Sequence, residues 1–264
     1  MISIITPVYN GEKFIEFCIK NVIAQNCPDM EHIIVDGGST DKTVELIEHY
    51  AQNYSHIRWI SEKDKGQSDA MNKGIGMAKG EILSFLNVDD YYEPNVLNRV
   101  LQIFKTLPDP SLLVGNCKIW NDEEEMIQIN KPQKMHFHDL LLGWDINPFP
   151  ANPSAYFYHS SIHEKIGLYD IEDRDAMDLH FILKTVQVAT VKYVDETWGN
   201  FRVIEGTKTF NSNQSGETLK RIRRILDSYR QNLPFALRVQ LAAKRQFYKK
   251  KRGFERRVKY LISR

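Results

Sequence analysis

The chain has 264 residues, of which 42% are hydrophobic and 26% charged, and this length suffices for one large domain with a buried core. These proportions are ordinary for a water-soluble globular protein, and three irregularly spaced cysteines argue against a disulfide framework. No apolar run approaches the ~20 residues that a membrane-spanning helix needs, and no signal peptide precedes the first apolar run. We therefore expect a cytoplasmic protein, with peripheral binding to the inner face of the plasma membrane as a further option.

The net charge of +1 conceals a strong asymmetry along the chain. Residues 220–264 contain 16 lysines and arginines against 2 acidic residues, whereas the remainder contains 19 basic and 32 acidic residues. A basic segment on an acidic body predicts an anionic partner, which could be a membrane surface, a phosphorylated lipid or a nucleic acid. Interleaved aromatic residues suit nucleic acid, but no other feature of the chain does, so we expect no nucleic-acid partner.

The first half of the chain alternates short apolar runs with helical patterns. Strands are expected at 2–6, 31–36, 57–60 and 81–86, and helices near 14–22 and at 41–50, 68–78 and 94–107. This alternation is typical of βαβ units, which build a mostly parallel sheet flanked by helices, the Rossmann-like α/β class. In such sheets ligands bind at the carboxyl ends of the strands.

The second half is less regular. Extended pieces are expected between 112 and 130 around a polar turn at 121–125, a strand at 191–194, and helices at 160–166, 176–188, 218–231 and from Pro234 onward. We divide the chain into a domain at 1–215 and a basic amphipathic helical tail at 216–264. Within the domain, 1–110 is the predicted nucleotide-binding half and 111–215 the predicted acceptor-binding half. The tail should place its apolar side chains on one face, namely Leu237, Leu241, Phe247, Phe254, Val258 and Leu261.

Each of the first four strands is followed by polar, turn-forming or acidic residues. These loops span Thr6–Gly11, Asp36–Asp41, Glu62–Gly66 and Asn87–Asp90. Any one of them can be a tight turn, because glycine, asparagine, aspartate and serine are what turns require. Four of them at one edge of a sheet favour a shared ligand site.

The loop Asn87-Val88-Asp89-Asp90 has the clearest chemistry. Its carboxylates follow a buried strand, and Mg²⁺ or Mn²⁺ prefers oxygen ligands, commonly one or two carboxylates together with substrate phosphates. Such a metal neutralises charge on a diphosphate leaving group. The alternative is that Asp89 or Asp90 caps the following helix.

Four sequence blocks carry a family resemblance: Thr6-Pro-Val-Tyr-Asn, Val35-Asp-Gly-Gly-Ser-Thr-Asp-Lys-Thr, Asp64-Lys-Gly-Gln-Ser-Asp-Ala-Met-Asn-Lys-Gly and Leu86-Asn-Val-Asp-Asp. In order and spacing they resemble the blocks of the inverting family 2 glycosyltransferases with a GT-A fold, of the bacterial surface-polysaccharide type. The resemblance covers roughly residues 1–100. It implies a nucleoside-diphosphate sugar as donor and a divalent metal, Mn²⁺ or Mg²⁺, as cofactor.

The resemblance also assigns roles to residues of the donor site. Asp36 would accept a hydrogen bond from the base, and Asp89 would be the main metal ligand. Asn87 stands where the family usually has the first aspartate of its D-x-D motif, so it would coordinate through its amide oxygen or bind the ribose. The full set of implied donor-site residues is Thr6, Val8, Tyr9, Asp36, Asp69, Asn72, Asn87, Val88 and Asp89.

Inverting transfer requires a general base that deprotonates the acceptor hydroxyl. In the family this is usually a carboxylate that opens a helix in the second half, which implies Asp178, with Asp175 as the other candidate. Either could instead be a carboxylate that interacts with the helix dipole. Asn152 resembles an acceptor-side block, and Trp144 and Trp198 could stack on a sugar or belong to the core.

The resemblance predicts transfer of a hexose from a UDP-sugar to a saccharide or lipid-linked saccharide in cell-surface polysaccharide biosynthesis, with the basic tail at an anionic membrane. A nucleotidyltransferase is an alternative, although no glycine-rich loop with Arg or Lys follows the first strand. An inactive nucleotide-binding scaffold of a membrane complex is another alternative, which Asn87 favours. The glycines Gly74, Gly76 and Gly80 are not a dinucleotide fingerprint, because they end a helix and do not follow a strand.

Overall fold

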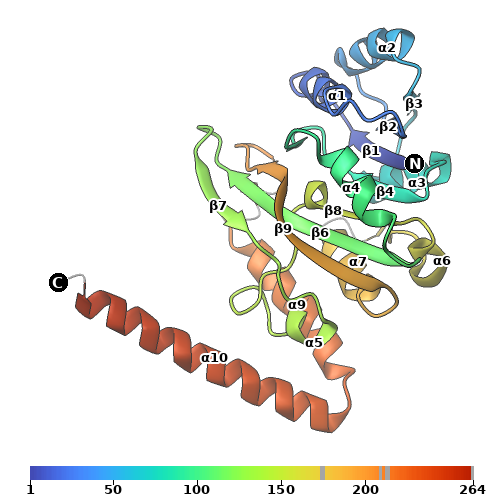
Figure 1. Ribbon diagram of the computed structural model, residues 1–264. Coiled ribbons are helices and arrows are strands. Elements are labelled where there is room, and N and C mark those ends of the chain that lie inside the picture. Colours follow the sequence, from blue (N-terminus) through green and yellow to red (C-terminus); the bar gives the residue numbers. More distant parts are fainter. Residues whose placement is uncertain (173–175, 208–209, 212–214, 263–264) are drawn as a thin grey trace.

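The computed structural model describes residues 1–172, 176–207, 210–211 and 215–262, with side chains up to residue 252. Within these residues, nine strands form one mixed sheet in the order β3-β2-β1-β4-β8-β6-β9-β5, and β7 pairs with β6 (Figure 1). The predicted strands of the first half are present as β1 (Ile2–Val8), β2 (Met30–Asp36), β3 (Ile57–Ser61) and β4 (Ile82–Phe85). All four run parallel, as the βαβ pattern predicts.

The register of these four strands aligns their carboxyl ends. Val8 pairs with Asp36, and Asp36 pairs with Ser61, so β1, β2 and β3 end side by side. Ile5 on β1 pairs with Phe85, the last residue of β4. The loops that follow these strands therefore meet at one edge of the sheet, where the sequence predicts the site.

Alternation along the strands directs side chains to two helical layers. One layer contains α1 (Ile15–Ile23), α2 (Thr43–Asn53) and α4 (Val96–Phe104). The apolar side chains of these helices pack with strand residues such as Ile4 and Ile34. The other contains α3 (Gln67–Met77) and α7 (Met177–Thr185), which pack with Ile5 and Ile33. Both faces are covered, which is why β1 and β2 are buried along their entire length.

Five further strands among the described residues, all but β5 from the second half, extend the sheet. These are β5 (Tyr91–Tyr92), β6 (Ser111–Trp120), β7 (Met126–Asn130), β8 (Tyr156–His159) and β9 (Thr190–Arg202). The strand predicted at 191–194 is thus much longer, because it pairs in parallel along nearly all of β6. The sequence did not predict β8, a four-residue aromatic strand that pairs antiparallel with both β4 and β6.

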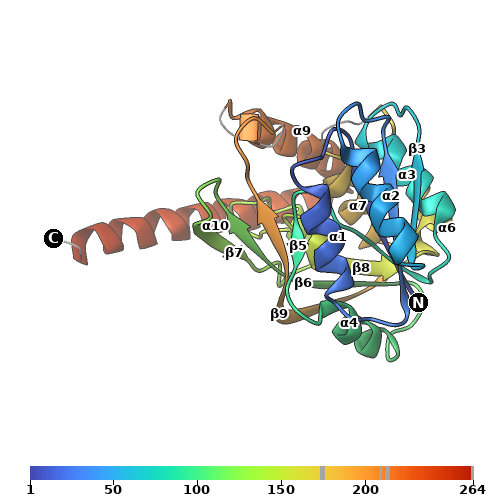
Figure 2. The same ribbon diagram turned by 90° about the horizontal axis from the view of Figure 1, so that it is seen from above.

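Short helices and the tail complete the chain. They are α5 (Phe137–Leu140), the 3₁₀ turn η1 (Pro153–Ala155), α6 (Ile162–Ile166), α9 (Glu217–Gln231) and α10 (Phe235–Ile262). In α9 the guanidinium of Arg230 donates to the carbonyl of Leu141 at 2.9 and 2.6 Å and so ties the tail to the domain. From there α10 runs outward, away from the sheet (Figure 2). No helix among the described residues is long and apolar enough to cross a membrane.

The apolar residues predicted for one face of the tail differ in exposure where the structure describes them. Leu241 is buried against the domain, whereas Phe247 is 64% exposed. The two side chains point about 120° apart on the helix, so the side of α10 that packs on the domain includes Leu241 and not Phe247. Phe235 and Val239 are exposed as well. The other predicted members, Phe254, Val258 and Leu261, lie beyond the side chains that the structure describes.

Candidate functional site

The loops after β1 and β2 bind each other directly. The backbone N–H of Asn10 donates to Ser39 Oγ at 2.7 Å, and Asn10 Oδ1 accepts from the Thr40 N–H at 2.9 Å. A third bond joins the Gly11 N–H to Thr43 Oγ1 at 2.8 Å. These bonds fix the two loops as one wall of the strand-end site.

Two residues implied for the base pocket face the interior. The side chain of Thr6 is fully buried, with its hydroxyl 2.9 Å from Nε2 of His32, and Val8 is only 4% exposed and packs against α1 and α2. Tyr9 is 62% exposed. Of these three residues only Tyr9 offers an exposed side chain to a ligand, so Thr6 and Val8 could contribute to donor binding through their backbone alone.

Asp36 holds the turn that follows β2. Its carboxylate accepts from the N–H groups of Gly38 and Ser39 at 3.0 Å each, from Ser61 Oγ at 2.7 Å, and from the Ser39 hydroxyl. A nucleobase that donates a hydrogen bond to this carboxylate would therefore replace one of the two serine hydroxyls, which can rotate away.

The polar residues of α3 have divided roles. Asp69 accepts from the Lys65 N–H at 3.1 Å and lies 3.7 Å from the ammonium of Lys73. Asn72 instead uses both ends of its amide on the backbone of Tyr169, at 2.8 and 2.9 Å. In this arrangement Asn72 holds the chain before α7, and its implied role in nucleotide binding stays a prediction. Its partner is 97 residues away, so no local sequence pattern could show this.

The loop after β4 is built around Asp90 and not around Asp89. Asp90 is fully buried and accepts from the amides of Asn87 at 2.9 Å and Asn152 at 2.7 Å, and from the Arg202 N–H at 3.2 Å. Gln67 at the start of α3 donates to Asn87 Oδ1 at 3.0 Å. The loop therefore joins β4, α3, η1 and β9. Sequence reasoning considered Asp90 only as one of the loop's two carboxylates or as a helix cap, and not as the centre of the loop.

Asp89 remains half-buried beside this network. Burial raises the pKa of its carboxyl, and the positive charge of Arg202 partly offsets that effect. Burial and the neighbouring charge of Asp89 raise the pKa of Asp90 well above its usual range. Two adjacent carboxyls with so little solvent resist carrying two negative charges, and a cation bound beside them would relieve that repulsion.

Arg202 is a site residue that the sequence did not reveal. Its Nε donates to the carbonyl of Asp89 at 2.5 Å, and its guanidinium lies 5.4 Å from the ring centres of Phe14 and Phe17. One of its terminal nitrogens is buried, without a hydrogen-bond partner among the described residues. Arg202 ends β9, which brings a permanent positive charge to the strand-end site from the far half of the chain.

A divalent metal fits this site only together with its substrate. Among the described residues, no group of three or more His, Cys, Asp and Glu side chains could hold a metal ion. Asp89 supplies one carboxylate, and Asn87 supplies an amide oxygen that currently accepts from Gln67. Mg²⁺ is commonly bound by one or two carboxylates plus phosphate oxygens and water, so the donor set suits a metal that arrives with a diphosphate.

Asp178, the predicted base, lies in the first turn of α7. Tyr156 donates to its Oδ1 at 3.2 Å, and burial together with the charge of Asp178 raises the pKa of Tyr156 well above its usual range. Ser68 at the start of α3 donates to the sulfur of Met177 at 3.0 Å, which joins the beginnings of α3 and α7. The other candidate base, Asp175, lies outside the described residues.

The three predicted acceptor-side residues have different positions. Asn152 is buried and bound to Asp90, as described above. Trp198 is only 2% exposed, packs on Phe157 and lies against Gly115, so of its two alternatives it takes the core position. Trp144 is half-buried, with its ring centre 4.8 Å from that of Phe149.

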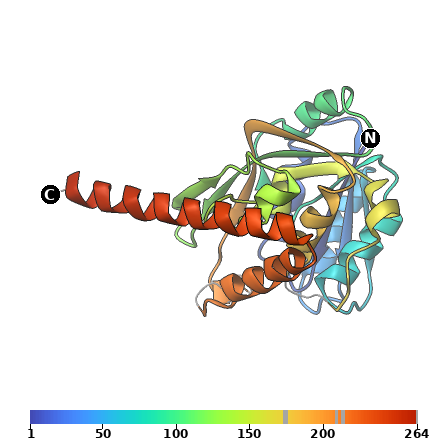
Figure 3. The ribbon, with the colours of Figure 1, turned by 90° about the horizontal axis from the view of Figure 1, so that it is seen from below.

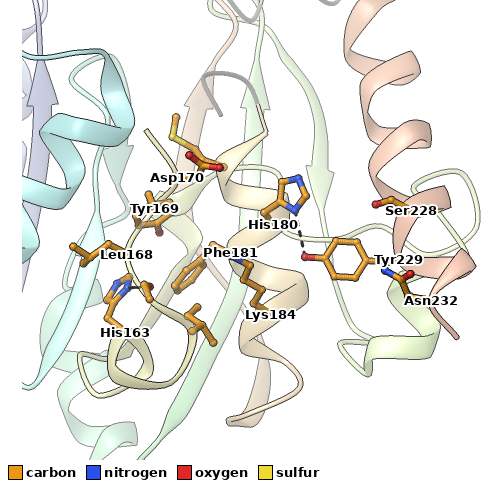
Figure 4. A pocket seen from close by; sticks show the side chains of 13 residues that line it. His163, Leu168, Tyr169, Asp170, His180, Phe181, Lys184, Ser228, Tyr229 and Asn232 are labelled. Atoms are coloured by element: carbon orange, nitrogen blue, oxygen red, sulfur yellow. Dashed lines mark hydrogen bonds between the residues drawn. The ribbon is translucent and has the colours of Figure 1, made fainter. Parts of the chain in front are cut away.

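A groove of about 500 Å³ runs beside α7, between the segment 163–170 and α9 (Figure 4). Figure 4 shows His180, Phe181 and Lys184 of α7 projecting into it, with Tyr229 of α9 opposite. His180 Nδ1 lies 3.3 Å from the Tyr229 hydroxyl. Met177 and His180, which flank Asp178 in the helix, both line the groove, so it begins next to the predicted base.

A helix-covered mixed sheet with an acidic turn at its strand ends agrees with the GT-A class of nucleotide-sugar glycosyltransferases, to which the sequence blocks point. The chain belongs to glycosyl transferase family 2, whose family model matches residues 3–166. Membership confirms the resemblance seen in the sequence and removes the nucleotidyltransferase alternative.

Individual relatives agree with this assignment. The chain is 30% identical over 210 residues to the uncharacterized glycosyltransferase EpsJ of Bacillus subtilis, a match that covers 74% of this chain and 59% of EpsJ. The structure of TarS residues 1–349 from S. aureus, in complex with UDP-GlcNAc, superposes with a TM-score of 0.70 at 19% identity and covers 94% of this chain and 72% of that one. The mannosyltransferase PcManGT from Pyrobaculum calidifontis, in complex with GDP-Man and Mn²⁺, gives 0.57 at 20% identity over 78% of this chain and 57% of that one. These two superpositions confirm the predicted GT-A fold.

Proposed function

We propose that the protein transfers a hexose, with inversion, from a UDP-sugar to a saccharide or lipid-linked saccharide acceptor in cell-surface polysaccharide biosynthesis. One observation carries the proposal: the segment 152–156 links the two groups that the reaction needs. Asn152 binds Asp90 next to Asp89 of the proposed donor loop, and Tyr156, four residues later, binds Asp178. The proposed diphosphate site and the proposed base are thus both hydrogen-bonded to the same short segment of the chain.

The donor would occupy the strand ends. Tyr9 is the exposed aromatic residue beside the loop of Asp36, and a nucleobase can stack on such a ring. Uridine is the favoured nucleoside because the TarS structure, which shares the fold over 94% of this chain, contains UDP-GlcNAc. The sugar itself follows from neither the loops nor the fold.

The diphosphate would bind near Asp89 with a divalent cation. We propose Mn²⁺ or Mg²⁺, with Asp89 as the carboxylate ligand and the Asn87 amide oxygen as a second oxygen donor. The PcManGT complex contains Mn²⁺, which supports a metal in this fold. When bound, the ion neutralises charge on the departing nucleoside diphosphate. The guanidinium of Arg202 is a permanent positive charge in the same region and complements that effect.

Asp178 would act as the general base. Its carboxylate takes the proton of the acceptor hydroxyl, whose oxygen attacks the anomeric carbon while the bond to the nucleoside diphosphate breaks on the opposite face. The hydrogen bond from Tyr156 orients the carboxylate, and because Tyr156 keeps its own proton, that bond persists as the pH rises. Tyr156 is therefore a positioning residue.

The acceptor would enter along the groove beside α7, which begins next to Asp178. Aromatic and apolar side chains there suit the faces of sugar rings, and Lys184 suits a phosphate of a lipid-linked acceptor. The exposed Phe235, Val239 and Phe247 of α10, with the basic residues around them, suit peripheral binding to an anionic membrane.

Calorimetric titration tests the donor proposal directly. UDP-, GDP- and dTDP-sugars are titrated with and without Mn²⁺ into the wild type, into Asp89→Ala and into Asp122→Ala, which removes an exposed carboxylate on the β6–β7 turn. We expect one UDP-sugar to bind with Mn²⁺, Asp89→Ala to lose the dependence on metal, and Asp122→Ala to behave as the wild type. Binding of none of the sugars, or equal metal dependence in both variants, would contradict the proposal.

A further inference from the structure

The inner side of α10 forms a second cleft with α9, separate from the strand-end site. α9 and α10 meet at the turn that joins them (Figure 3), and a cleft of about 230 Å³ lies between the end of α9 and the first turns of α10. Three arginines, Arg230, Arg238 and Arg245, line it, with Asp227 as its one acidic lining residue. Leu241 forms its apolar floor.

The positive charge of this cleft is not neutralised by its own residues. Arg230 uses Nη1 on Asp227 at 2.6 Å and its other donors on the carbonyl of Leu141. Burial lowers the pKa of Arg230, and the positive charge of Arg245 lowers it further, although Asp227 opposes this. The single carboxylate is therefore committed to Arg230, and the other two guanidinium groups have none in the cleft.

Arg245 carries the strongest indication of a missing ligand. It is half-buried, and its Nε is buried without a hydrogen-bond partner among the described residues. Buried donors are nearly always paired in folded proteins, so an unpaired one requires an acceptor. Arg238 lies seven residues earlier on α10, two helical turns away on the same face, and its guanidinium sits 5.8 Å from the Phe235 ring.

We propose that this cleft binds a phosphate group, with Arg238 and Arg245 donating to its oxygens and Arg230 adding charge. Guanidinium groups match phosphate because their paired N–H groups bind two oxygens at once, and a phosphate carries enough negative charge for several of them. The phosphate could belong to a lipid headgroup, since α10 also exposes the apolar side chains of Phe235, Val239 and Phe247, or to a free phosphate or diphosphate. The proposal does not depend on the transferase activity.

Titration of inorganic pyrophosphate into the full chain tests the site. Chelator is included, so that no metal–diphosphate complex forms at the strand ends. Arg245→Gln and the more exposed Arg238→Gln are compared with Lys250→Gln, a matched loss of one charge at an exposed position of the same helix outside the cleft. We expect affinity to fall about tenfold or more in each arginine variant, because a charged hydrogen bond is lost, and to change less than about twofold in Lys250→Gln.

Vesicles distinguish the two sources of phosphate. Phosphatidylglycerol vesicles are sedimented with each variant, with and without pyrophosphate as competitor. If Arg245→Gln loses more vesicle binding than Lys250→Gln, and pyrophosphate displaces the vesicles, the ligand is a lipid headgroup. If the two variants bind vesicles equally while Arg245→Gln still loses affinity for pyrophosphate, the ligand is a free phosphate. Equal pyrophosphate affinity in Arg238→Gln, Arg245→Gln and Lys250→Gln, or no binding to the wild type, would overturn the proposal. Unchanged helical circular dichroism in each variant excludes misfolding as the cause.

Discussion

Two glycines of α3 should respond in opposite directions to the same substitution. A methyl group added at Gly74 would have two carbons of Ile5 at 3.4 Å and a third, Cγ2, far inside van der Waals contact. Ile5 is fully buried in a central strand, so this overlap costs about 1–3 kcal/mol. The better helix propensity of alanine offsets up to about 1 kcal/mol of that cost. At Gly76 no heavy atom lies within 4 Å, so only the propensity gain remains. We expect Gly74→Ala to lower the free energy of unfolding by about 1–2 kcal/mol, and Gly76→Ala to raise it by about 0.5–1 kcal/mol.

Urea unfolding followed by circular dichroism measures both effects. The close approach of α3 to β1 places Gln67, Ser68 and Asp69 at the strand ends, so Gly74→Ala should also weaken donor binding, whereas Gly76→Ala should not. The reasoning would be refuted if Gly74→Ala were as stable as the wild type, or if Gly76→Ala were the less stable of the two. Equal unfolding slopes in all three proteins are required for the comparison.

Three further predictions concern single contacts. Burial lowers the pKa of His32 to about 3, whereas an unfolded histidine titrates near 6.5. The contribution of His32 to the free energy of unfolding is therefore full above about pH 6.5 and falls by about 2 kcal/mol at about pH 5. In urea unfolding, His32→Gln should lose less stability than the wild type between these two pH values. Asn72→Ala leaves two backbone groups of Tyr169 unpaired and should lower the free energy of unfolding by about 1–3 kcal/mol in the same assay; an unchanged value would contradict the bonding described. Because the charge of Arg202 lowers the pKa of Asp89, Arg202→Gln should raise that pKa and move the acidic limb of the kcat/KM profile to higher pH; an unmoved limb would show that Asp89 is not the titrating group.

The nucleotide-binding half could be predicted from sequence because its signals are local. Each of its first four strands is an apolar run followed within a few residues by a polar turn. One short segment therefore indicates both the buried strand and the exposed loop that follows it. The parallel register then brings Asp36 and the Asn87–Asp90 loop to one edge. The division into a domain at 1–215 and a tail at 216–264 stays a prediction, although α9 and α10 fall within that tail.

The sequence was least informative where distant residues decide the outcome. Asn72 has the polarity of a ligand contact, but Tyr169 takes both ends of its amide. For Trp198 two positions were open, and the pairing of β9 with β6 places it in the core.

Asp90 and Arg202 are the converse case, because the structure gives them contacts that the sequence did not indicate. Their bond joins residues 112 positions apart, so the sequence alone could not show that Asp90 forms the centre of its loop or that Arg202 belongs to the site. In the tail, an apolar pattern predicted one face, whereas packing on α9 uses Leu241 and leaves Phe247 exposed.

The central claim is that Asp178 activates an acceptor against a UDP-sugar held at the strand ends. We would measure UDP release from the UDP-sugar that binds, with Mn²⁺ and a lipid-linked saccharide fraction, for the wild type, Asp178→Asn and Asp175→Asn. The account predicts turnover by the wild type and by Asp175→Asn, and a loss of about 10²–10⁴-fold in Asp178→Asn with unchanged donor affinity. Turnover by Asp178→Asn at the wild-type rate would contradict the assignment of the base. Donor binding with no turnover even by the wild type would favour a nucleotide-binding scaffold.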